Sequence, residues 1–526
     1  MHPGIILSIL GGYFLFLVLI SYFTARKATD NATFFVANKN APWYLVAFGM
    51  IGASLSGVTF ISLPGWVGST QFSYFQVVLG YMVGYFVIAT VLMPLYYRLN
   101  LTTIYTYLET RFGKVSHKTG SFFFLLSRTI GSAFRLYLVA VVFQVFIFDK
   151  WGMPFWVSVF VSLMLILVYT FRGGIKTIIW TDTLQTLFML LALITTIIYV
   201  VNTLDLGFFE ITREISQSNL SRIFFFDDWR SPQYFYKQFI SGAFIAIVMT
   251  GLDQDMMQKN LTCRSLRDAQ KNMFTFSITL LPVNLLFLGL GVLLLMFASA
   301  NNIPLPERTD YIYPSLAMDH LPAFAGIVFL LGLTAAAYSS ADSALAALTT
   351  SICVDFLGFK SEEVKPGINN DPAMVTPATG TRRVRSLIHI GITVLLFFVI
   401  MIFHRLNDES VINAIFKIAG YTYGPLLGLF VMGIFTKKKV RDRWVVLVCF
   451  LSPILTFIIS LASEGELGAL FMDYSAELGQ TIDIFAAYIF QGYRFSFELL
   501  LINGLLTFIG LLLISKPSPK NTVSTQ

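Results

Sequence analysis

Gly49-Met-Ile-Gly-Ala-Ser-Leu-Ser-Gly-Val-Thr-Phe-Ile-Ser-Leu-Pro-Gly65 is an apolar segment with glycine, serine and proline running through its middle. A helix that is broken at membrane depth frees backbone carbonyls, which lipid cannot satisfy but a bound cation can. A second such stretch, Met249-Thr-Gly-Leu-Asp-Gln-Asp-Met-Met-Gln-Lys259, follows five apolar segments later. Two interrupted helices at this spacing indicate an inverted-repeat membrane fold.

The composition indicates an integral membrane protein. Of the 526 residues, 56% are hydrophobic and only 12% are charged, and the mean hydropathy is +0.73. Soluble domains carry roughly 25% charged residues. The apolar runs are close to the length that a membrane helix needs, so we predict an all-α polytopic protein of about 13 spans. The expected spans are 4–23, 43–69, 75–97, 119–148, 154–171, 176–201, 237–258, 273–299, 323–356, 386–404, 410–435, 444–462 and 493–515.

These spans suggest a single membrane domain covering residues 1–526. Its expected parts are an additional N-terminal helix at 4–23, a first repeat at 43–201, a second repeat at 237–435, two C-terminal helices within 444–515, and a cytoplasmic tail at 516–526. Spans two and seven would be the broken helices of a 5+5 arrangement.

The distribution of lysine and arginine predicts the orientation. An odd number of spans places the two termini on opposite sides, and basic clusters such as 437–443 fall in the segments assigned to the cytoplasm. The N-terminus is therefore expected outside, in the cell (inner) membrane of a bacterium. The net charge of +7 follows from this orientation and from contact with anionic membrane lipid, so we expect no nucleic acid partner.

A polar stretch inside the ninth span, Thr334-Ala-Ala-Ala-Tyr-Ser-Ser-Ala-Asp-Ser343, is the strongest signal for a functional site. Hydroxyls and a carboxylate at membrane depth are costly unless they face a partner, a cavity or an ion. Close helix packing through small residues is the alternative, although Asp342 contributes nothing to it. The chain shows no nucleophile–base pair and no histidine cluster at metal-ligand spacing, so we do not expect an enzyme.

Five blocks of the sequence resemble the sodium/solute symporter family, which carries sugars, proline, sialic acid, pantothenate and iodide. They are Ser54–Gly65, Tyr169–Gln185 with its Gly-Gly to Trp-Thr-Asp-x-x-Gln pattern, Asp253–Lys259, the Ser339-Ser340 stretch, and Gly420–Phe430. The resemblance implies the leucine-transporter-like fold and a sodium site where the second span meets the ninth. Its ligands would be the carbonyls of Gly52, Leu55 and Ala336 and the hydroxyls of Ser339 and Ser340.

A second cation site is a further implication of the resemblance. In the sialic acid carriers an aspartate matching Asp182 joins two serines of the ninth span, and here these serine positions hold Asp342 and Ser343. Two nearby carboxylates would bind sodium more tightly, or one of them would carry a proton because neighbouring like charges raise a pKa. Alternatively, Asp182 is a solvated acid near the end of its span.

Polar residues expected to line the cavity between the repeats are the candidates for solute binding: Ser54, Ser56 and Thr59 on the second span, Asp253 and Gln254 on the seventh, and Tyr421 and Tyr423 on the eleventh. Arg128 and Arg135 share one face of the fourth span and would either bind a carboxylate or pair with acids such as Asp253. Asp255 and Lys259 are expected to pair with each other at i,i+4 spacing. Gly420, Gly424 and Pro425 are the expected outer gate or hinge.

Together these features predict a sodium-coupled symporter that imports a small organic solute by alternating access and works as a monomer. Sodium ion is the expected cosubstrate. The solute would be a sugar, sialic acid, amino acid or carboxylate, and Gly131 stands where the sialic acid carriers have a carboxylate-binding arginine. The alternatives are a proton-coupled symporter and a transporter-like membrane sensor of a small solute.

Overall fold

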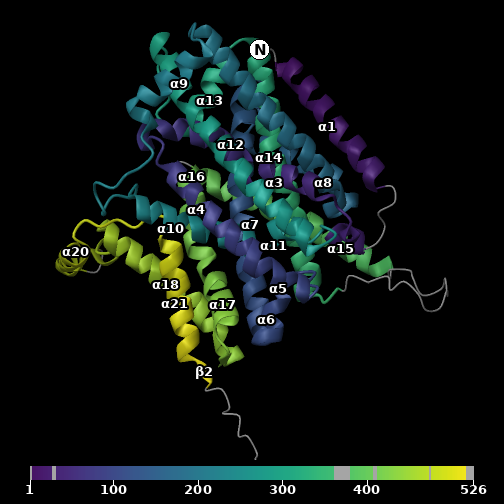
Figure 1. The fold of residues 1–526 in the computed structure, drawn as a ribbon, viewed down its shortest axis with the longest axis vertical. Coiled ribbons are helices and arrows are strands. Elements are labelled where there is room, and N and C mark those ends of the chain that lie inside the picture. Colours follow the sequence, from purple (N-terminus) through teal and green to yellow (C-terminus); the bar gives the residue numbers. More distant parts are fainter. Residues whose placement is uncertain (1–2, 26–30, 360–378, 407–410, 473–474, 517–526) are drawn as a thin grey trace, which may run out of the picture.

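The computed structural model describes residues 3–25, 31–359, 379–406, 411–472 and 475–516, which form a bundle of helices (Figure 1). The long and membrane-core helices are α1 (Pro3–Ala25), α3 (Trp43–Thr70), α4 (Tyr74–Val87), α5 (Met93–Arg98), α7 (Lys114–Phe143), α8 (Phe155–Thr203), α10 (Phe235–Ala246), α11 (Gln254–Asn260), α12 (Leu266–Ala300), α14 (Ala323–Ser351), α15 (Thr379–Leu406), α16 (Val411–Thr422), α17 (Gly424–Phe435), α18 (Val445–Glu464) and α21 (Leu499–Leu513). The short helices are α2 (Asn31–Val36), α6 (Thr106–Arg111), α9 (Phe208–Gln217), α13 (Ile312–Ser315), α19 (Ala469–Met472) and α20 (Ala476–Phe490).

Within the described residues, 9 helices are long and apolar enough to cross a membrane, and counting two bent pairs raises this number to 11. The expected spans at 154–171 and 493–515 correspond to the shorter apolar helices Phe155–Thr170 and Leu499–Leu513. The predominantly helical, multi-pass fold class is confirmed, whereas helix length alone does not establish the expected number of spans. Most of the loop expected at 357–385 and of the tail expected at 516–526 lies outside the described residues.

The two helix breaks predicted from the sequence are present. Helix α3 contains one non-helical residue, Ser56, with φ 35° and ψ 170°. The seventh span bends by 69° between Phe235–Gly251 and α11, and its last turn before the bend, Ile247–Gly251, is π-helical. A positive φ at a serine is rare, because the side chain crowds the backbone there, so Ser56 marks a true interruption of the helix.

Two further breaks are present, one between the fifth and sixth expected spans and one inside the eleventh. Helix α8 contains both the fifth and the sixth expected span and turns at Gly174, where φ is 53° and a glycine is needed for that reason. Helices α16 and α17 form the second bent pair, with an angle of 45°.

Helix α14 lies at the centre of the bundle and packs against α8 and α3 (Figure 1). All residues from Gly332 to Ser351 are buried. Small side chains make this possible: a Cβ on Gly332 would lie 2.2 Å from Ala192 Cβ of α8, and one on Gly57 would lie 3.0 Å from Ala337 Cβ of α14. The close packing expected from small residues therefore coexists with the polar stretch of the same helix.

The last helices form a group beside this core. Helix α21 packs against α17 and α18, and a short antiparallel pairing of β1 (Lys439–Val440) with β2 (Ser515–Lys516) joins the ends of this group (Figure 1). In that pairing Lys439 lies opposite Lys516 and Val440 opposite Ser515.

Candidate ion and solute site

The break in α3 lies against α14, where the resemblance places the first sodium site. Besides the Gly57–Ala337 approach, the Gly52 amide donates a hydrogen bond to Thr186 Oγ1 of α8, 3.1 Å away. A Cβ at Gly52 would lie 2.3 Å from that oxygen, so only glycine allows the contact. Non-helical geometry at Ser56 interrupts the i to i−4 hydrogen-bond ladder just after Leu55. Carbonyls of this turn thus become available beside α14.

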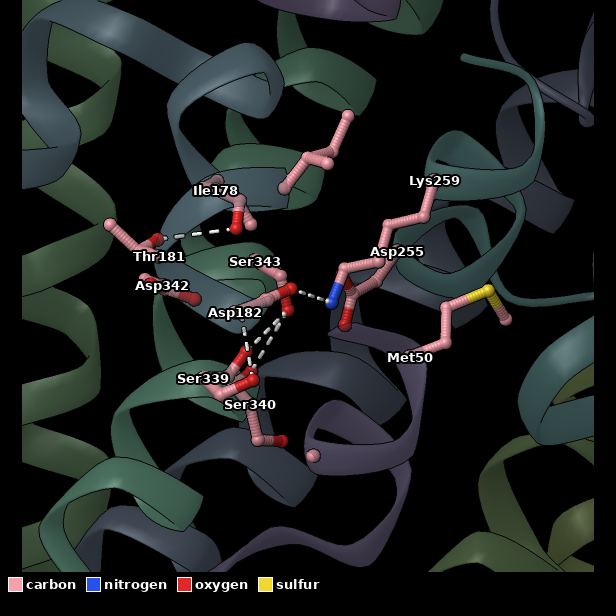
Figure 2. Close-up of polar contacts among 12 residues, drawn as sticks. Met50, Ile178, Thr181, Asp182, Asp255, Lys259, Ser339, Ser340, Asp342 and Ser343 are labelled. Carbon is pink, nitrogen blue, oxygen red and sulfur yellow. Dashed lines mark hydrogen bonds and ion pairs between the residues drawn. The ribbon is translucent and has the colours of Figure 1, made fainter. Parts of the chain in front are cut away.

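The two serine hydroxyls of the predicted first site both have protein partners. Ser339 Oγ donates to Asp182 Oδ1 at 2.7 Å, which leaves the lone pairs of the serine oxygen available for a cation (Figure 2). Ser340 Oγ instead accepts a hydrogen bond from Arg135 Nη1 at 2.8 Å. A sodium ion that uses the Ser340 oxygen would therefore compete with the Arg135 guanidinium.

The predicted second cation site contains a lysine that the sequence reasoning did not place there. Lys259 Nζ lies 2.7 Å from Asp182 Oδ2, and the exposed fractions of the two side chains are 2% and 1% (Figure 2). The expected pairing of Lys259 with Asp255 is wrong, because Asp255 is bound by Arg128 of α7. Each of the two ion pairs joins helices that are distant in sequence, which the i,i+4 rule cannot detect.

The other two residues of this predicted site are held differently. Asp342 Oδ2 accepts a hydrogen bond from the Tyr169 hydroxyl at 3.0 Å, while its Oδ1 is buried without a hydrogen-bond partner among the described residues. The hydroxyl of Ser343 donates to the backbone carbonyl of Ser339 at 3.0 Å (Figure 2). Asp182 is fully buried, so it is not the solvated acid considered as the alternative.

A cavity of about 90 Å³ opens next to the broken part of α3. Five expected solute-binding residues line it, namely Ser54, Ser56, Thr59, Arg128 and Arg135. Ligand pockets usually measure roughly 300–1,000 Å³. In this conformation the cavity therefore fits a solute of few heavy atoms, and a larger one requires its lining side chains to move.

Four expected solute-binding residues do not line this cavity and have other contacts in this conformation. Asp253 caps the start of α11 by accepting from the Asp255 amide at 2.9 Å, and it also accepts from the Tyr423 hydroxyl at 2.6 Å. Gln254 joins helix α11 to the chain before α6, through Ile104 N and the Thr102 carbonyl.

The two tyrosines of the eleventh span, Tyr421 and Tyr423, contact residues outside this cavity. The ring of Tyr421 lies 5.8 Å from that of Phe457 of α18. Tyr423 lines a much smaller hollow of about 10 Å³, which Arg128 and Arg135 also line. All four polar side chains sit near helix breaks, and three of them form hydrogen bonds that hold these breaks together.

Several residues of the cavity were missed by the sequence reasoning. Tyr74, Tyr81 and Tyr85 of α4 line it, together with Asn284 of α12. The hydroxyls of Tyr74 and Tyr81 lie 3.1 Å apart. The spacing of these tyrosines at i, i+7 and i+11 places them on one helix face, and this pattern was the available signal.

Arg135 differs from the other buried arginine of the cavity. It is 8% exposed, and within the described part of the chain no carboxylate lies within ion-pair distance of its guanidinium. Arg128 is paired with Asp255, whereas Arg135 contacts the neutral Ser340 hydroxyl and its Nε is buried without a hydrogen-bond partner among the described residues. A buried cation normally has a counter-ion, so a site for an anion is indicated.

The break between α16 and α17 is supported from α21. Asn503 Nδ2 donates to the carbonyls of Gly420 and Tyr421 at 3.0 and 2.7 Å. A Cβ at Gly424 would lie 2.1 Å from Asn503 Cγ. The lone asparagine in the apolar run of α21 was the signal for this contact, and Gly420, Gly424 and Pro425 lie at the break as expected.

Comparisons with known proteins agree with this architecture. The sequence model described as "Sodium:solute symporter family" matches residues 34–442. The chain is similar to the sodium/sialic acid symporter NanT of Aliivibrio fischeri, with 25% identity over 441 residues that cover 80% of this chain and 81% of that protein. It is also similar to the sodium-coupled monocarboxylate transporter 2 of Mus musculus, with 22% identity over 425 residues that cover 78% and 64% of the two chains.

The fold matches that of a solved membrane protein. A substrate-bound, outward-open Na⁺-coupled sialic acid symporter superposes with a TM-score of 0.76, covering 97% of this chain and 99% of that chain at 20% sequence identity. The likeness shows a shared fold.

Proposed function

The chain belongs to the sodium:solute symporter family, and from this premise we propose that its solute is a small organic carboxylate bound by Arg135. Family membership establishes a multi-pass membrane protein that imports a small solute coupled to sodium, and it is not an enzyme. The identity of the solute and the residues that bind it are the proposed part.

The observation that carries the proposal is the unneutralised guanidinium in the cavity. Arg135 lines the cavity beside Ser54 and Ser56 and has no carboxylate partner in the described part of the chain. Its planar fork is suited to bind a carboxylate through two hydrogen bonds. The volume of about 90 Å³ favours a small acid over a bulky one. Two of the similar proteins are named for sialic acid, which is a carboxylic acid, and for monocarboxylates.

We place the sodium ion at the carbonyls of Gly52, Leu55 and Ala336 and the hydroxyls of Ser339 and Ser340. Carbonyl and hydroxyl oxygens replace the hydration shell of sodium without adding a full charge, so the ion remains releasable. The break at Ser56 and the lone pairs of Ser339 support this assignment. Together with Asp182, Asp342 and Ser343, these residues surround one polar region inside the core.

Coupling would arise because sodium and Arg135 use the same oxygen. In this structure the Arg135 guanidinium donates a hydrogen bond to Ser340 Oγ. A solute carboxylate that binds Arg135 draws it away from Ser340 and so frees a sodium ligand. Sodium, in turn, releases Arg135 for the solute. By linkage each ligand then increases the affinity for the other by the same factor.

Alternating access completes the proposed mechanism. The bend between α16 and α17 at Gly420, Gly424 and Pro425 would act as the outer hinge, since hinges are a few residues at element ends that absorb backbone rotation. We further propose one membrane domain with two repeats, working as a monomer in contact with lipid. Its N-terminus would lie outside the cell membrane and its C-terminus in the cytoplasm, as the basic residues favour.

Uptake into proteoliposomes tests the proposed solute class. Purified protein is reconstituted, and accumulation of small labelled carboxylates and their neutral amides is measured under an inward sodium or potassium gradient. We expect sodium-dependent accumulation of a carboxylate and none of its amide. Sodium-driven uptake of neutral sugars alone would overturn the carboxylate proposal. Uptake driven by a proton gradient would favour proton coupling, and binding without accumulation would favour a sensor.

A further inference from the structure

We propose that the Lys259 ammonium permanently occupies the position of a second transported cation, so that one sodium ion accompanies each solute. This inference rests on the sodium-coupled transport proposed above, and it concerns the number of ions per cycle. The region in question is bounded by Asp182 of α8, Asp342 and Ser343 of α14, and Lys259 of α11 (Figure 2).

The geometry places the ammonium against the carboxylate that a second ion would need. Lys259 Nζ is 2.7 Å from Asp182 Oδ2, while the other oxygen of Asp182 accepts from Ser339. Both oxygens of the carboxylate are therefore engaged. The hydroxyl of Ser343, which would complete the site, is turned toward the backbone of its own helix. A second sodium ion would therefore have to displace the Lys259 ammonium from Asp182.

Lys259 is buried, so its ion pair with Asp182 is an interaction of the protein interior and not a solvent-exposed surface pair. The side chain is 2% exposed and reaches across to α8, although Asp255 stands one turn before it on the same helix. Asp255 is neutralised by Arg128 instead. Burying an ammonium is expensive unless it compensates a buried carboxylate, and here that carboxylate is Asp182.

The charge balance of the region sets the number of sodium ions. Asp182 and Lys259 form a neutral ion pair, while Arg135 has no carboxylate partner among the described residues. When sodium binds at Ser340 and Arg135 turns to the solute carboxylate, one sodium replaces one guanidinium and the balance is kept. A second sodium would leave a net positive charge in a region shielded from water, where uncompensated charge is costly.

Equilibrium binding of radioactive ²²Na⁺ to the purified full-length protein tests the proposal. The wild-type protein should bind one sodium ion per molecule, and sodium activation of uptake should have a Hill coefficient near one. Lys259→Met keeps an unbranched side chain of similar length but removes the charge, so it should bind two sodium ions. Lys259→Met combined with Asp182→Asn should return to one ion, because the extra carboxylate charge is then also gone.

Lys237→Met is the matched control, because Lys237 is also a buried lysine but pairs with Glu498 at 3.6 Å, away from α14. It should still bind one ion. Two sodium ions on the wild-type protein, or one on a Lys259→Met variant that elutes as a folded species, would overturn the proposal. If Lys259→Met does not fold, the wild-type count alone decides between one and two. Complete absence of sodium binding to the wild-type protein would overturn the proposed function itself, which is a different result.

Discussion

Replacing Arg135 with methionine should tighten sodium binding, which is the opposite of what removing an ordinary site residue does. In this structure the guanidinium donates to Ser340 Oγ at 2.8 Å, so sodium must displace it to use that oxygen. Arg135→Met removes the competitor and leaves an apolar side chain of similar length in the cavity. Ser339, Ser340 and the broken turn of α3 remain unchanged.

The size of the effect follows from the contact that is lost. A hydrogen bond from a charged donor contributes about 1.5–3 kcal/mol. If sodium no longer has to break it, the apparent sodium Kd should fall by roughly 10- to 100-fold, since about 1.4 kcal/mol corresponds to a factor of ten. The same variant should lose the ability of a carboxylate solute to increase sodium affinity, because the group that links the two sites is gone.

Thermal unfolding of the purified variant across a sodium chloride series, at ionic strength held constant with potassium chloride, provides the affinity. A ligand that binds only the folded state stabilises it by RT ln(1 + [L]/Kd), so fitting this relation to the rise in unfolding temperature with sodium concentration gives Kd. Arg135→Lys, which keeps a positive charge near Ser340, is the matched control and should bind sodium much as the wild type does. Unchanged or weaker sodium affinity in Arg135→Met would refute the shared-oxygen mechanism.

Four further outcomes can be measured. Ser340→Ala should severely weaken the sodium dependence of uptake, because it deletes one proposed ligand oxygen, and wild-type sodium activation in that variant would contradict the site assignment. Asn503→Leu should lower the stability of the protein by about 1–3 kcal/mol, because the carbonyls of Gly420 and Tyr421 lose their buried donor; an unchanged unfolding midpoint would count against this support. Gly424→Ala should impair folding or transport because its Cβ would overlap Asn503, whereas Gly131→Ala, with no atom within 4 Å of the new Cβ, should be tolerated in the same uptake assay. Wild-type protein should unfold at a higher temperature in sodium chloride than in potassium chloride of equal ionic strength, and equal midpoints would demote sodium coupling.

The sequence alone determined the membrane class, the broken helices and much of the cavity. Glycine and serine cannot sustain a helix through an apolar segment as well as leucine or alanine, so the interruptions at Ser56 and near Gly251 follow from local composition. Ser54, Ser56 and Thr59 line the cavity because they lie at such an interruption. The polar stretch around Ser339 was recognisable because charge and hydroxyls are costly in lipid.

Only the tertiary structure decided which charges meet. Local spacing predicts a pair between Lys259 and Asp255. In the structure, Lys259 forms an ion pair with Asp182 of α8, and Asp255 forms one with Arg128 of α7. Arg135 donates a hydrogen bond to the neutral Ser340 hydroxyl. Two amide side chains also have partners that the sequence did not indicate. Gln254 donates to the Thr102 carbonyl and does not line the cavity, and Asn503 donates to the Gly420 carbonyl at the break between α16 and α17. Helix propensity depends on neighbours a few residues apart, whereas the partner of a buried charge depends on which helices approach it in space, and that is set by the fold as a whole.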